Sequence, residues 1–472
     1  MGRRKRNLPL LESVEFTDIG EGGKAVGRHQ EKVVFAKGAV PGDVGNVQVY
    51  RKKSSFFEGQ LTELVKSSED RTAPFCNHFE LCGGCSWQHL NYNAQASFKE
   101  AKVKAALERI GKIEVKEWQP ILKAPEITHH RNKLEYTFSE NKWLTDEQIK
   151  SDAEFDRNGL GFHLPGKFDK ILHLEQCYLQ DDRTNLIRNF VFEKSKSLGI
   201  SYFNLRAQVG VLRNLIVRNT RINKWMVILV ITEFNDLVNE LLQEISNQFE
   251  FVSSVFYVVN QKKNDSIADL NPIHFKGQNH IQEVFETPEN EKVKYRIGPK
   301  SFFQTNSNQA EKLYQLAYNL IAPQPHETMY DFYTGTGSIA LFFAKAIQKV
   351  VGVEYVEEAV ADARINAQEN GLENTTFLAG DMKDIFTDEF ITKHGTPDFV
   401  VTDPPRAGMH EDVVKRLVAL KAKRVLYISC NPSTQARDLS LMKDSYTVEF
   451  SQPVDMFPHT NHVENVVLLK LK

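Results

Sequence analysis

The stretch MYDFYTGTGSIALFFAKA, residues 329–346, decides the fold of this 472-residue chain. A strand-like apolar lead runs into a turn that contains Gly335 and Gly337, and a helix-forming run follows. Glycine lets the backbone turn tightly and approach a ligand without interference from a Cβ atom. From about residue 291 strands and helices alternate, which is typical of a doubly wound parallel sheet. We therefore predict a Rossmann-like α/β domain over residues 291–472.

Acidic residues end the next two predicted strands of this domain. KVVGVE ends in Glu354, 19 residues after Gly335, an offset at which a carboxylate can accept hydrogen bonds from a ribose. TTFLAGD ends in Asp381, which suits the edge of an adenine. Ile339 stands where a dinucleotide fingerprint has its third glycine, so the turn suits a pyrophosphate poorly. S-adenosylmethionine, which has a ribose and an adenine but no phosphate, fits this pattern better than a dinucleotide or a purely structural glycine turn.

Two further strand ends carry groups suited to catalysis. DFVVTDPPRAG places Asp403 after the fourth strand, and RVLYISCNPST places Cys430 after the fifth, at the same edge of the sheet. The carboxylate of Asp403 could accept the N3–H of a uracil, with a guanidinium close by. A lone cysteine is more often a buried structural residue. Its position at a strand end, before polar NPST and beside DPPR, favours a nucleophile.

A candidate base follows in DMFPHTNHVENVVLL, residues 455–469. Glu464 stands among apolar residues, and partial burial there would raise its pKa toward that of a useful base. The alternative is that Glu464 only pairs with His459 or His462. One cysteine, one carboxylate and a methyl donor are what methylation of uracil at C5 needs, because a thiolate that adds to C6 makes C5 nucleophilic.

The other four cysteines look like ligands of one metal centre. Cys76, Cys82 and Cys85 lie in FCNHFELCGGC, and Cys177 follows in LEQCYL. Thiolates suit both iron–sulfur clusters and zinc. Only Cys82 and Cys85 have the spacing of a zinc knuckle, and the spacing of radical S-adenosylmethionine enzymes is missing. On the chemistry of the ligands both metals stay open, and a structural or RNA-shaping role is favoured over redox catalysis. His78 and His89 lie nearby but outside the ligand set.

Residues 1–68 read as short strands with glycine turns and a PGD corner, which predicts a small β-barrel. VVFAKGAVPGD resembles the TRAM domain, an OB-like RNA-binding barrel, and Arg51, Lys52 and Lys53 are candidate RNA contacts. The alternative is a packing module. Residues 69–290 are strand-rich and irregular, and we expect a central α+β domain that carries the cluster and contacts RNA.

Composition narrows the class of protein further. A net charge of −2 and a pI near 6.7 argue against non-specific coating of nucleic acid, although residues 1–68 carry an excess of basic side chains. The basic start MGRRKRNLPLLE leads into no apolar segment of the kind a secretory signal has. WMVILVI, residues 225–231, is the size of a strand and too short for a membrane span. A cytoplasmic protein without disulfides is expected.

The motifs together resemble the RNA uracil-C5 methyltransferases. The resemblance rests on FFQTN (302–306), DFYTGTGS, TDPPRAG, SCNPST and FPHTNHVEN, and it covers essentially the whole chain. It implies that Cys430 is the nucleophile and Glu464 the base. It also implies a set of residues around the cofactor and target base: Gln304, Tyr333, Ser338, Glu354, Asp381 and Asp403. The family often has Phe at the place of Tyr333 and Asn at the place of Ser338, which leaves the reaction unaffected.

The barrel and the cysteine run are similar to the iron–sulfur branch of this family, which modifies 23S ribosomal RNA. This likeness implies a 4Fe–4S cluster on Cys76, Cys82, Cys85 and Cys177, and a ribosomal RNA substrate bound by a monomer. Transfer RNA is the second candidate substrate. A cytosine-C5 methyltransferase would have a cysteine where Pro405 and Arg406 stand. A non-catalytic RNA-binding or ribosome-assembly factor is the remaining alternative.

Overall fold

The computed structural model describes residues 8–151 and 153–472, so the basic residues 1–7 lie outside the described residues. The chain divides into two compact units. The first comprises residues 1–101 and 457–461, and the second comprises residues 102–456 and 462–472. The division into three domains, with boundaries after residues 68 and 290, stays a prediction.

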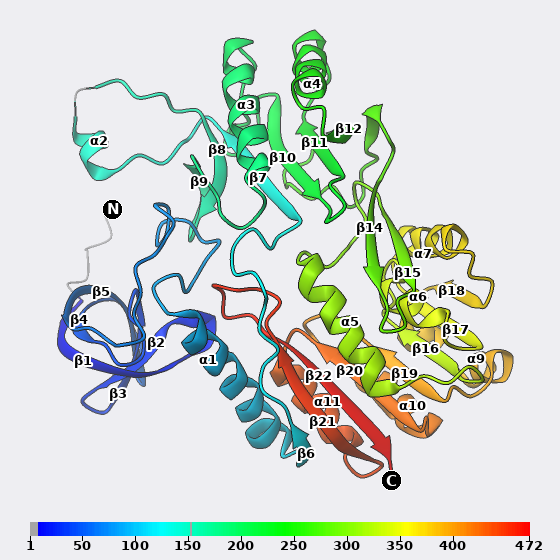
Figure 1. The fold of residues 1–472 in the computed structure, drawn as a ribbon. Coiled ribbons are helices and arrows are strands. Elements are labelled where there is room, and N and C mark those ends of the chain that lie inside the picture. Colours follow the sequence, from blue (N-terminus) through cyan, green and yellow to red (C-terminus); the bar gives the residue numbers. More distant parts are fainter. Residues whose placement is uncertain (1–7, 152) are drawn as a thin grey trace. The chain divides into compact units, whose positions relative to one another are not determined.

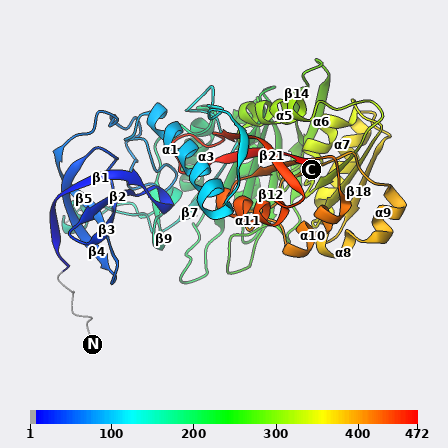
Figure 2. The same ribbon diagram turned by 90° about the horizontal axis from the view of Figure 1, so that it is seen from below.

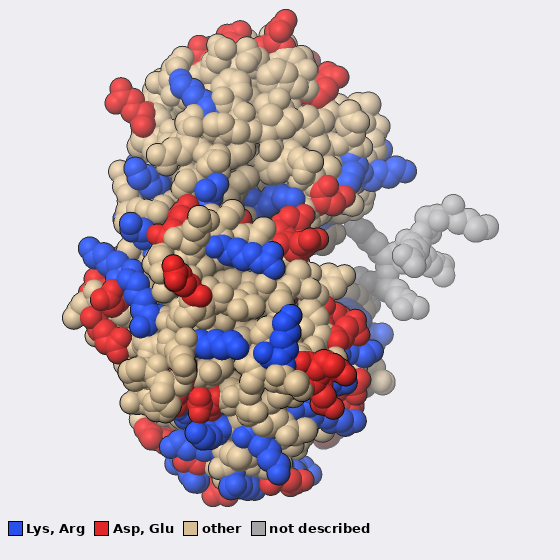
Figure 3. All heavy atoms as spheres, turned by 90° about the vertical axis from the view of Figure 1, so that its right-hand side faces the viewer, with Lys and Arg blue, Asp and Glu red and all other residues tan. Residues whose placement is uncertain are grey.

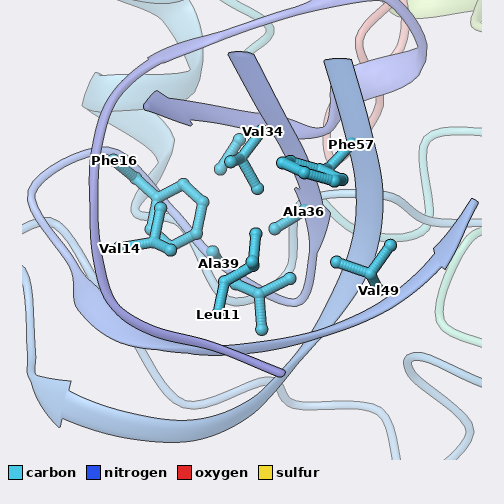
Figure 4. Close-up of a cluster of buried hydrophobic side chains, with 10 residues drawn as sticks. Leu11, Val14, Phe16, Val34, Ala36, Ala39, Val49 and Phe57 are labelled. Carbon is cyan, nitrogen blue, oxygen red and sulfur yellow. The ribbon is translucent and has the colours of Figure 1, made fainter. Parts of the chain in front are cut away.

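The first unit contains a closed five-stranded barrel with the strand order β1-β2-β3-β5-β4. Its strands are β1 (Leu10–Ile19), β2 (Ala25–His29), β3 (Lys32–Lys37), β4 (Val44–Lys52) and β5 (Phe56–Lys66), with a short helix η1 (Glu21–Gly23) after β1. Alternating residues point inward and form one apolar core, drawn in Figure 4. The predicted N-terminal β-barrel is therefore present.

The PGD corner of the barrel forms around one buried carboxylate. Asp43 accepts the backbone N–H groups of Val40 at 2.8 Å and Ser68 at 2.9 Å, and Arg71 pairs with it. Burial opposes ionisation of Asp43, but these bonds outweigh it and lower its pKa. A charged group without contact with water is stabilised in this way only when its hydrogen bonds are made.

The second unit contains a seven-stranded sheet with the order β13-β12-β11-β10-β7-β8-β9. Its strands are β7 (Lys133–Ser139), β8 (Gly159–Leu164), β9 (Lys167–His173), β10 (Leu212–Asn219), β11 (Trp225–Ile231), β12 (Val252–Val259) and β13 (Ile273–Gly277). Helices α3 (Arg183–Ser197) and α4 (Asp236–Gln248) contact each other and this sheet (Figure 1), and α2 (Asp146–Lys150) lies between β7 and β8 in the chain. This sheet with its helices agrees with the expected α+β organisation.

An eight-stranded sheet with the order β18-β17-β16-β19-β20-β22-β21-β6 completes the second unit. Its strands are β6 (Val115–Trp118), β16 (Thr328–Phe332), β17 (Lys349–Glu354), β18 (Thr375–Ala379), β19 (Phe399–Thr402), β20 (Arg424–Ser429), β21 (Tyr446–Val454) and β22 (Glu464–Leu471). The strands from β18 to β20 run parallel, and β22 is antiparallel to β20. The carboxyl ends of the parallel strands therefore meet at one edge.

Helices cover both faces of this sheet, as Figure 2 shows for α5 to α7 on one side and α8, α10 and α11 on the other. They are α5 (Ser307–Ile321), α6 (Ser338–Ala344), α7 (Glu357–Glu369), α8 (Met382–Ile385), α9 (Asp388–His394), α10 (Glu411–Leu420) and α11 (Pro432–Met442). The hairpin β14 (Ile281–Glu286) and β15 (Lys292–Ile297) precedes α5 and β16 in the chain. This is the doubly wound arrangement that the sequence predicts.

The remaining helices are α1 (Tyr92–Ala105) and the single turn η2 (Ala106–Gly111), which packs against α11. None of the helices in the described part of the chain has the length and apolar content needed to span a bilayer. On the face drawn in Figure 3, acidic and basic side chains are interspersed, and neither sign forms a continuous patch. That face therefore lacks the footprint of a non-specific nucleic-acid binder.

Candidate active site

The glycine turn between β16 and α6 has the backbone that the sequence predicts. Tyr333, Gly335 and Gly337 all have positive φ, at 63°, 56° and 79°. A Cβ atom built on Gly337 would meet Ala363 and Phe377 at 3.1 and 3.2 Å, whereas one built on Gly335 would meet nothing within 4 Å. Gly337 is thus required for packing, and Gly335 borders open space that a ligand can approach.

Glu354 is fixed at the end of β17 beside this turn. Its Oε2 accepts the N–H of Gly335 at 3.0 Å, and its Oε1 accepts the N–H of Val356 at 2.9 Å. Each carboxylate oxygen has two acceptor positions, so both can still accept a ribose hydroxyl. These bonds orient the side chain before a ligand binds, and the predicted contact of Glu354 with a ribose stays a prediction.

Three other residues of the predicted set lie around the same turn. Asp381 is exposed and caps α8, where it accepts the N–H of Lys383 at 2.9 Å. Tyr333 is half-buried, and burial raises the pKa of its hydroxyl to about 12. The hydroxyl of Ser338 lies 2.9 Å from that of Tyr314 in α5. Ser338 is therefore engaged by the protein, and its predicted cofactor contact stays a prediction.

Asp331, one residue before the end of β16, was not predicted as part of the site. It is only 1% exposed and accepts a hydrogen bond from the hydroxyl of Thr334. Burial raises the pKa of Asp331 to about 7, and the nearby carboxylates Asp403 and Glu354 also raise it. The pattern that could have identified Asp331 is an acid near a strand end, a few residues before a glycine turn.

The loop before α5 carries Gln304 and an exposed aromatic ring that the sequence analysis left unassigned. Phe302 is 68% exposed, and its carbonyl accepts the hydroxyl of Thr336 in the glycine turn at 3.3 Å. Asn132 donates to the carbonyl of Gln304 at 2.8 Å, and Arg218 donates to the carbonyl of Gly298 at 2.9 Å. The loop is thus held from two sides, which leaves the Phe302 ring available for stacking.

Cys430 follows β20 and precedes Asn431, the N-cap of α11, whose side chain accepts the N–H of Ser433. Burial raises the pKa of the Cys430 thiol to about 11, and the carboxylates of Glu464 and Asp403 also raise it. The Arg406 guanidinium lowers it by its charge and by a hydrogen bond. The thiol therefore lies within electrostatic reach of all three groups.

Asp403, Arg406 and Glu464 come from two segments far apart in the chain. Asp403 directly follows β19, and Glu464 opens β22 with 6% exposure. Burial raises the pKa of both carboxyls, the charge of Asp403 raises the pKa of Glu464 further, and Arg406 lowers it. Arg406 also lies 3.4 Å from His462, measured between Nη2 and Nδ1. The sequence predicts a guanidinium close to Asp403 but gives Arg406 no role of its own.

The histidines and cysteines of the first unit have their own surroundings. His459 contacts Gln95, with 3.2 Å between Nδ1 and Nε2, and buried His89 lies 3.4 Å from the carbonyl of Ala39. The N–H of Gly84 donates to the sulfur of Cys82 at 3.4 Å. Among residues 8–151 and 153–472, however, no three His, Cys, Asp or Glu side chains are arranged to hold a metal ion.

The predicted fourth cysteine, Cys177, is buried in the second unit. Its N–H donates to Asn185 at 2.8 Å, and Asn185 donates back to its carbonyl at 3.1 Å. The four cysteines as one ligand set therefore stay a prediction from the sequence.

The eight-stranded sheet with its glycine turn and acidic strand ends defines a class I methyltransferase fold. The crystal structure of Pyrococcus abyssi tRNA (uracil-54, C5)-methyltransferase in complex with S-adenosyl-L-homocysteine is similar, with a TM-score of 0.74 and 28% identity. The match covers 96% of this chain and 99% of that one.

Sequence comparisons identify the family. Residues 267–472 match the model of the tRNA (uracil-5-)-methyltransferases. An uncharacterized RNA methyltransferase of Bacteroides thetaiotaomicron is 48% identical over 95% of this chain and 99% of its own length. An uncharacterized RNA methyltransferase of Porphyromonas gingivalis is 46% identical over 97% of this chain and 99% of its own length. The chain belongs to the S-adenosylmethionine-dependent RNA uracil-C5 methyltransferase family.

Proposed function

We propose that this enzyme methylates uracil C5 in 23S ribosomal RNA through a covalent bond between Cys430 and C6 of the base. The observation that carries the proposal is the grouping of Cys430, Arg406, Asp403 and Glu464, whose charges act on one another at one edge of the sheet. A thiolate, a cation that stabilises it, an acceptor and a basic carboxylate are the groups that this reaction requires.

The chain's residues have distinct tasks in this mechanism. The Cys430 thiolate attacks C6, a C–S bond forms, and electron density moves to C5. Asp403 accepts the N3–H of the base and holds it in register. After C5 has gained its methyl group, Glu464 takes the C5 proton, the C5=C6 bond re-forms, and the thiolate leaves. Both carboxyls have raised pKa values, so near neutral pH they repel the thiolate less than two full charges would.

The residues around the glycine turn fit S-adenosylmethionine, which supplies the methyl group when bound. Glu354 would accept the ribose hydroxyls, Asp381 would meet the adenine edge, and Gly335 borders the open space that the ligand would enter. Gln304, Tyr333 and Ser338 complete the proposed set. Phe302 is added to it, since an exposed ring beside the turn suits stacking on an RNA base.

The barrel and the cysteines support the ribosomal branch of the family. We infer that Cys76, Cys82, Cys85 and Cys177 bind a 4Fe–4S cluster of structural role, with zinc as the alternative. A barrel of this type binds single-stranded RNA through an exposed face. Lys53 and Arg51 are candidates there, although Arg51 pairs with Glu58 at 3.0 Å. Transfer RNA is the second candidate substrate, because the similar Pyrococcus abyssi enzyme is a tRNA methyltransferase.

Glu464→Gln tests the chemistry most directly. Without the base, thiolate addition and methyl transfer can proceed, but the proton cannot leave C5 and the enzyme should stall on its RNA. Unmodified 23S ribosomal RNA and transfer RNA transcripts are incubated separately with methyl-labelled S-adenosylmethionine. A labelled band of reduced mobility on a denaturing gel, formed with the ribosomal transcript, is the expected result.

Cys430→Ala is the matched control, because it removes the attacking atom and should give neither adduct nor 5-methyluridine. A labelled adduct only with transfer RNA would move the substrate to the second candidate. Normal turnover by the Gln variant would exclude Glu464 as the base, and turnover by the Ala variant would exclude the covalent route.

A further inference from the structure

Asp438, in the middle of α11, is a fully buried carboxylate with four hydrogen-bond donors. Its Oδ2 accepts the hydroxyl of Tyr427 at 2.6 Å and the N–H of Met409 at 2.8 Å. Its Oδ1 accepts Nε and Nη2 of Arg437 at 2.9 and 2.7 Å. These donors come from β20, from the loop after β19 and from α11 itself. Removing any one of these donors would leave part of a buried carboxylate without a hydrogen bond, which costs free energy.

The same helix makes further bonds to that loop. Arg437 donates to the carbonyls of Ala407 at 3.0 Å and Met409 at 3.1 Å. Asn431 and Thr434 both donate to the carbonyl of Arg406, at 3.0 and 3.2 Å. Residues 406–409 of the loop are thus attached to α11, whose N-cap Asn431 directly follows Cys430.

The loop and α11 are packed so closely at Gly408 that no side chain fits between them. The φ of Gly408 is 78°, and a Cβ atom built there would meet Arg437 Nη2 at 2.6 Å and Asp438 Oδ2 at 2.7 Å. The loop backbone therefore lies directly on the Asp438–Arg437 pair. Because the loop carries Arg406 and the helix follows Cys430, any shift between them changes the distance from guanidinium to thiol.

We propose that Asp438 is a positioning residue, which holds the Arg406 loop on α11 so that the guanidinium stays at the Cys430 thiol. The inference rests on the proposed role of Cys430 as nucleophile. The charged groups that act on the thiol are Glu464, Asp403 and Arg406. Arg406 alone among them favours the thiolate, and His462 lies beside it. Displacement of the loop therefore removes the favourable charge and leaves the two unfavourable ones.

Asp438→Asn is the test, because the amide keeps the shape but replaces one of the two accepting oxygens with an NH2 group, which faces the two donors that this oxygen received. Alkylation of Cys430 by iodoacetamide is followed against pH in the cofactor-free enzyme, by mass spectrometry of its peptide. We expect the midpoint to rise by about one pH unit, which makes alkylation at pH 7.5 about tenfold slower. The maximal rate of methylation should fall similarly, while S-adenosylhomocysteine affinity is unchanged. Asp444→Asn, an exposed change just beyond α11, should behave as wild type.

A second pair of variants keeps the test decisive if Asp438→Asn fails to fold. Thr434→Ala removes the bonds of one hydroxyl, to the carbonyls of Arg406 and Asn431, and Thr434→Ser retains both. The Ala variant should shift the alkylation profile in the same direction by a smaller amount, and the Ser variant should restore it. Unchanged profiles in a folded Asp438→Asn protein, or identical profiles for the Thr434 pair, would overturn the positioning role. Alkylation is measured without turnover, so failure of the proposed methylation would appear separately.

Discussion

Glu464 shows how one residue links the proposed chemistry to stability. Burial raises its pKa above the ordinary value of 4.5, so the ionised form is disfavoured in the folded protein. A carboxyl with a raised folded-state pKa contributes stability that is complete below its unfolded pKa and is lost as pH rises through the folded one. Asp403 contributes in the same direction, and its charge also acts on Glu464.

We therefore predict that Glu464→Gln reduces the loss of thermal stability between about pH 5 and pH 8, because an amide has no proton to lose. Melting temperatures of wild type and variant at both pH values provide the measurement. Glu449→Gln is the control, since Lys116 and Thr447 lower the pKa of Glu449 and its contribution changes only in acid. An equal decline with pH in wild type and Glu464→Gln would contradict the raised pKa.

Within the element formed by the glycine turn, Gly335 and Gly337 have the same kind of backbone strain but different surroundings. Both Gly335 and Gly337 have positive φ, which costs a residue with a Cβ about 1–2 kcal/mol. Only at Gly337 would a methyl group also press on protein, namely Ala363 and Phe377. At Gly335 it would enter the open space proposed for the cofactor.

Gly337→Ala should consequently lower the melting temperature more than Gly335→Ala does. Gly335→Ala should instead weaken binding of S-adenosylhomocysteine by about tenfold or more, an estimate for a methyl group placed against a bound ligand. Differential scanning fluorimetry and isothermal titration calorimetry on the two variants measure the two effects. Unchanged affinity in Gly335→Ala would show that Gly335 does not border the cofactor.

At the scale of the whole molecule, the cysteines divide into a proposed cluster set and the proposed nucleophile. Protein purified without oxygen should be brown and contain about four irons per chain, the number that four thiolates hold in such a cluster. Cys82→Ser should bleach the colour and lower RNA affinity while S-adenosylhomocysteine binding is retained. Cys430→Ser, a change of the same chemistry outside the set, should keep the colour. If the wild-type protein is colourless and contains one zinc ion per chain, the four cysteines bind zinc instead of an iron–sulfur cluster.

The fold and much of the candidate site could be predicted because they depend on local patterns. Alternating strands and helices, a glycine turn and acids at strand ends predict a doubly wound sheet and the edge at which its ligand binds. The barrel followed from short alternating strands and the PGD corner. Cys430, Glu354 and Asp403 could be chosen because a strand end in a parallel sheet is a defined place in space.

Contacts between distant segments were decided only by the tertiary structure. Asn132 binds the carbonyl of Gln304, although the two residues are 172 positions apart in the chain. Strand β6 lies in the stretch that the sequence assigns to a central domain, yet it pairs with β21 in the eight-stranded sheet. The contact of Ser338 with Tyr314 and that of Asp438 with Tyr427 also depend on how separate elements pack. A sequence pattern reports which face of an element is apolar. Which partner satisfies a given buried polar group depends on how the elements pack, and that is set by the whole core at once.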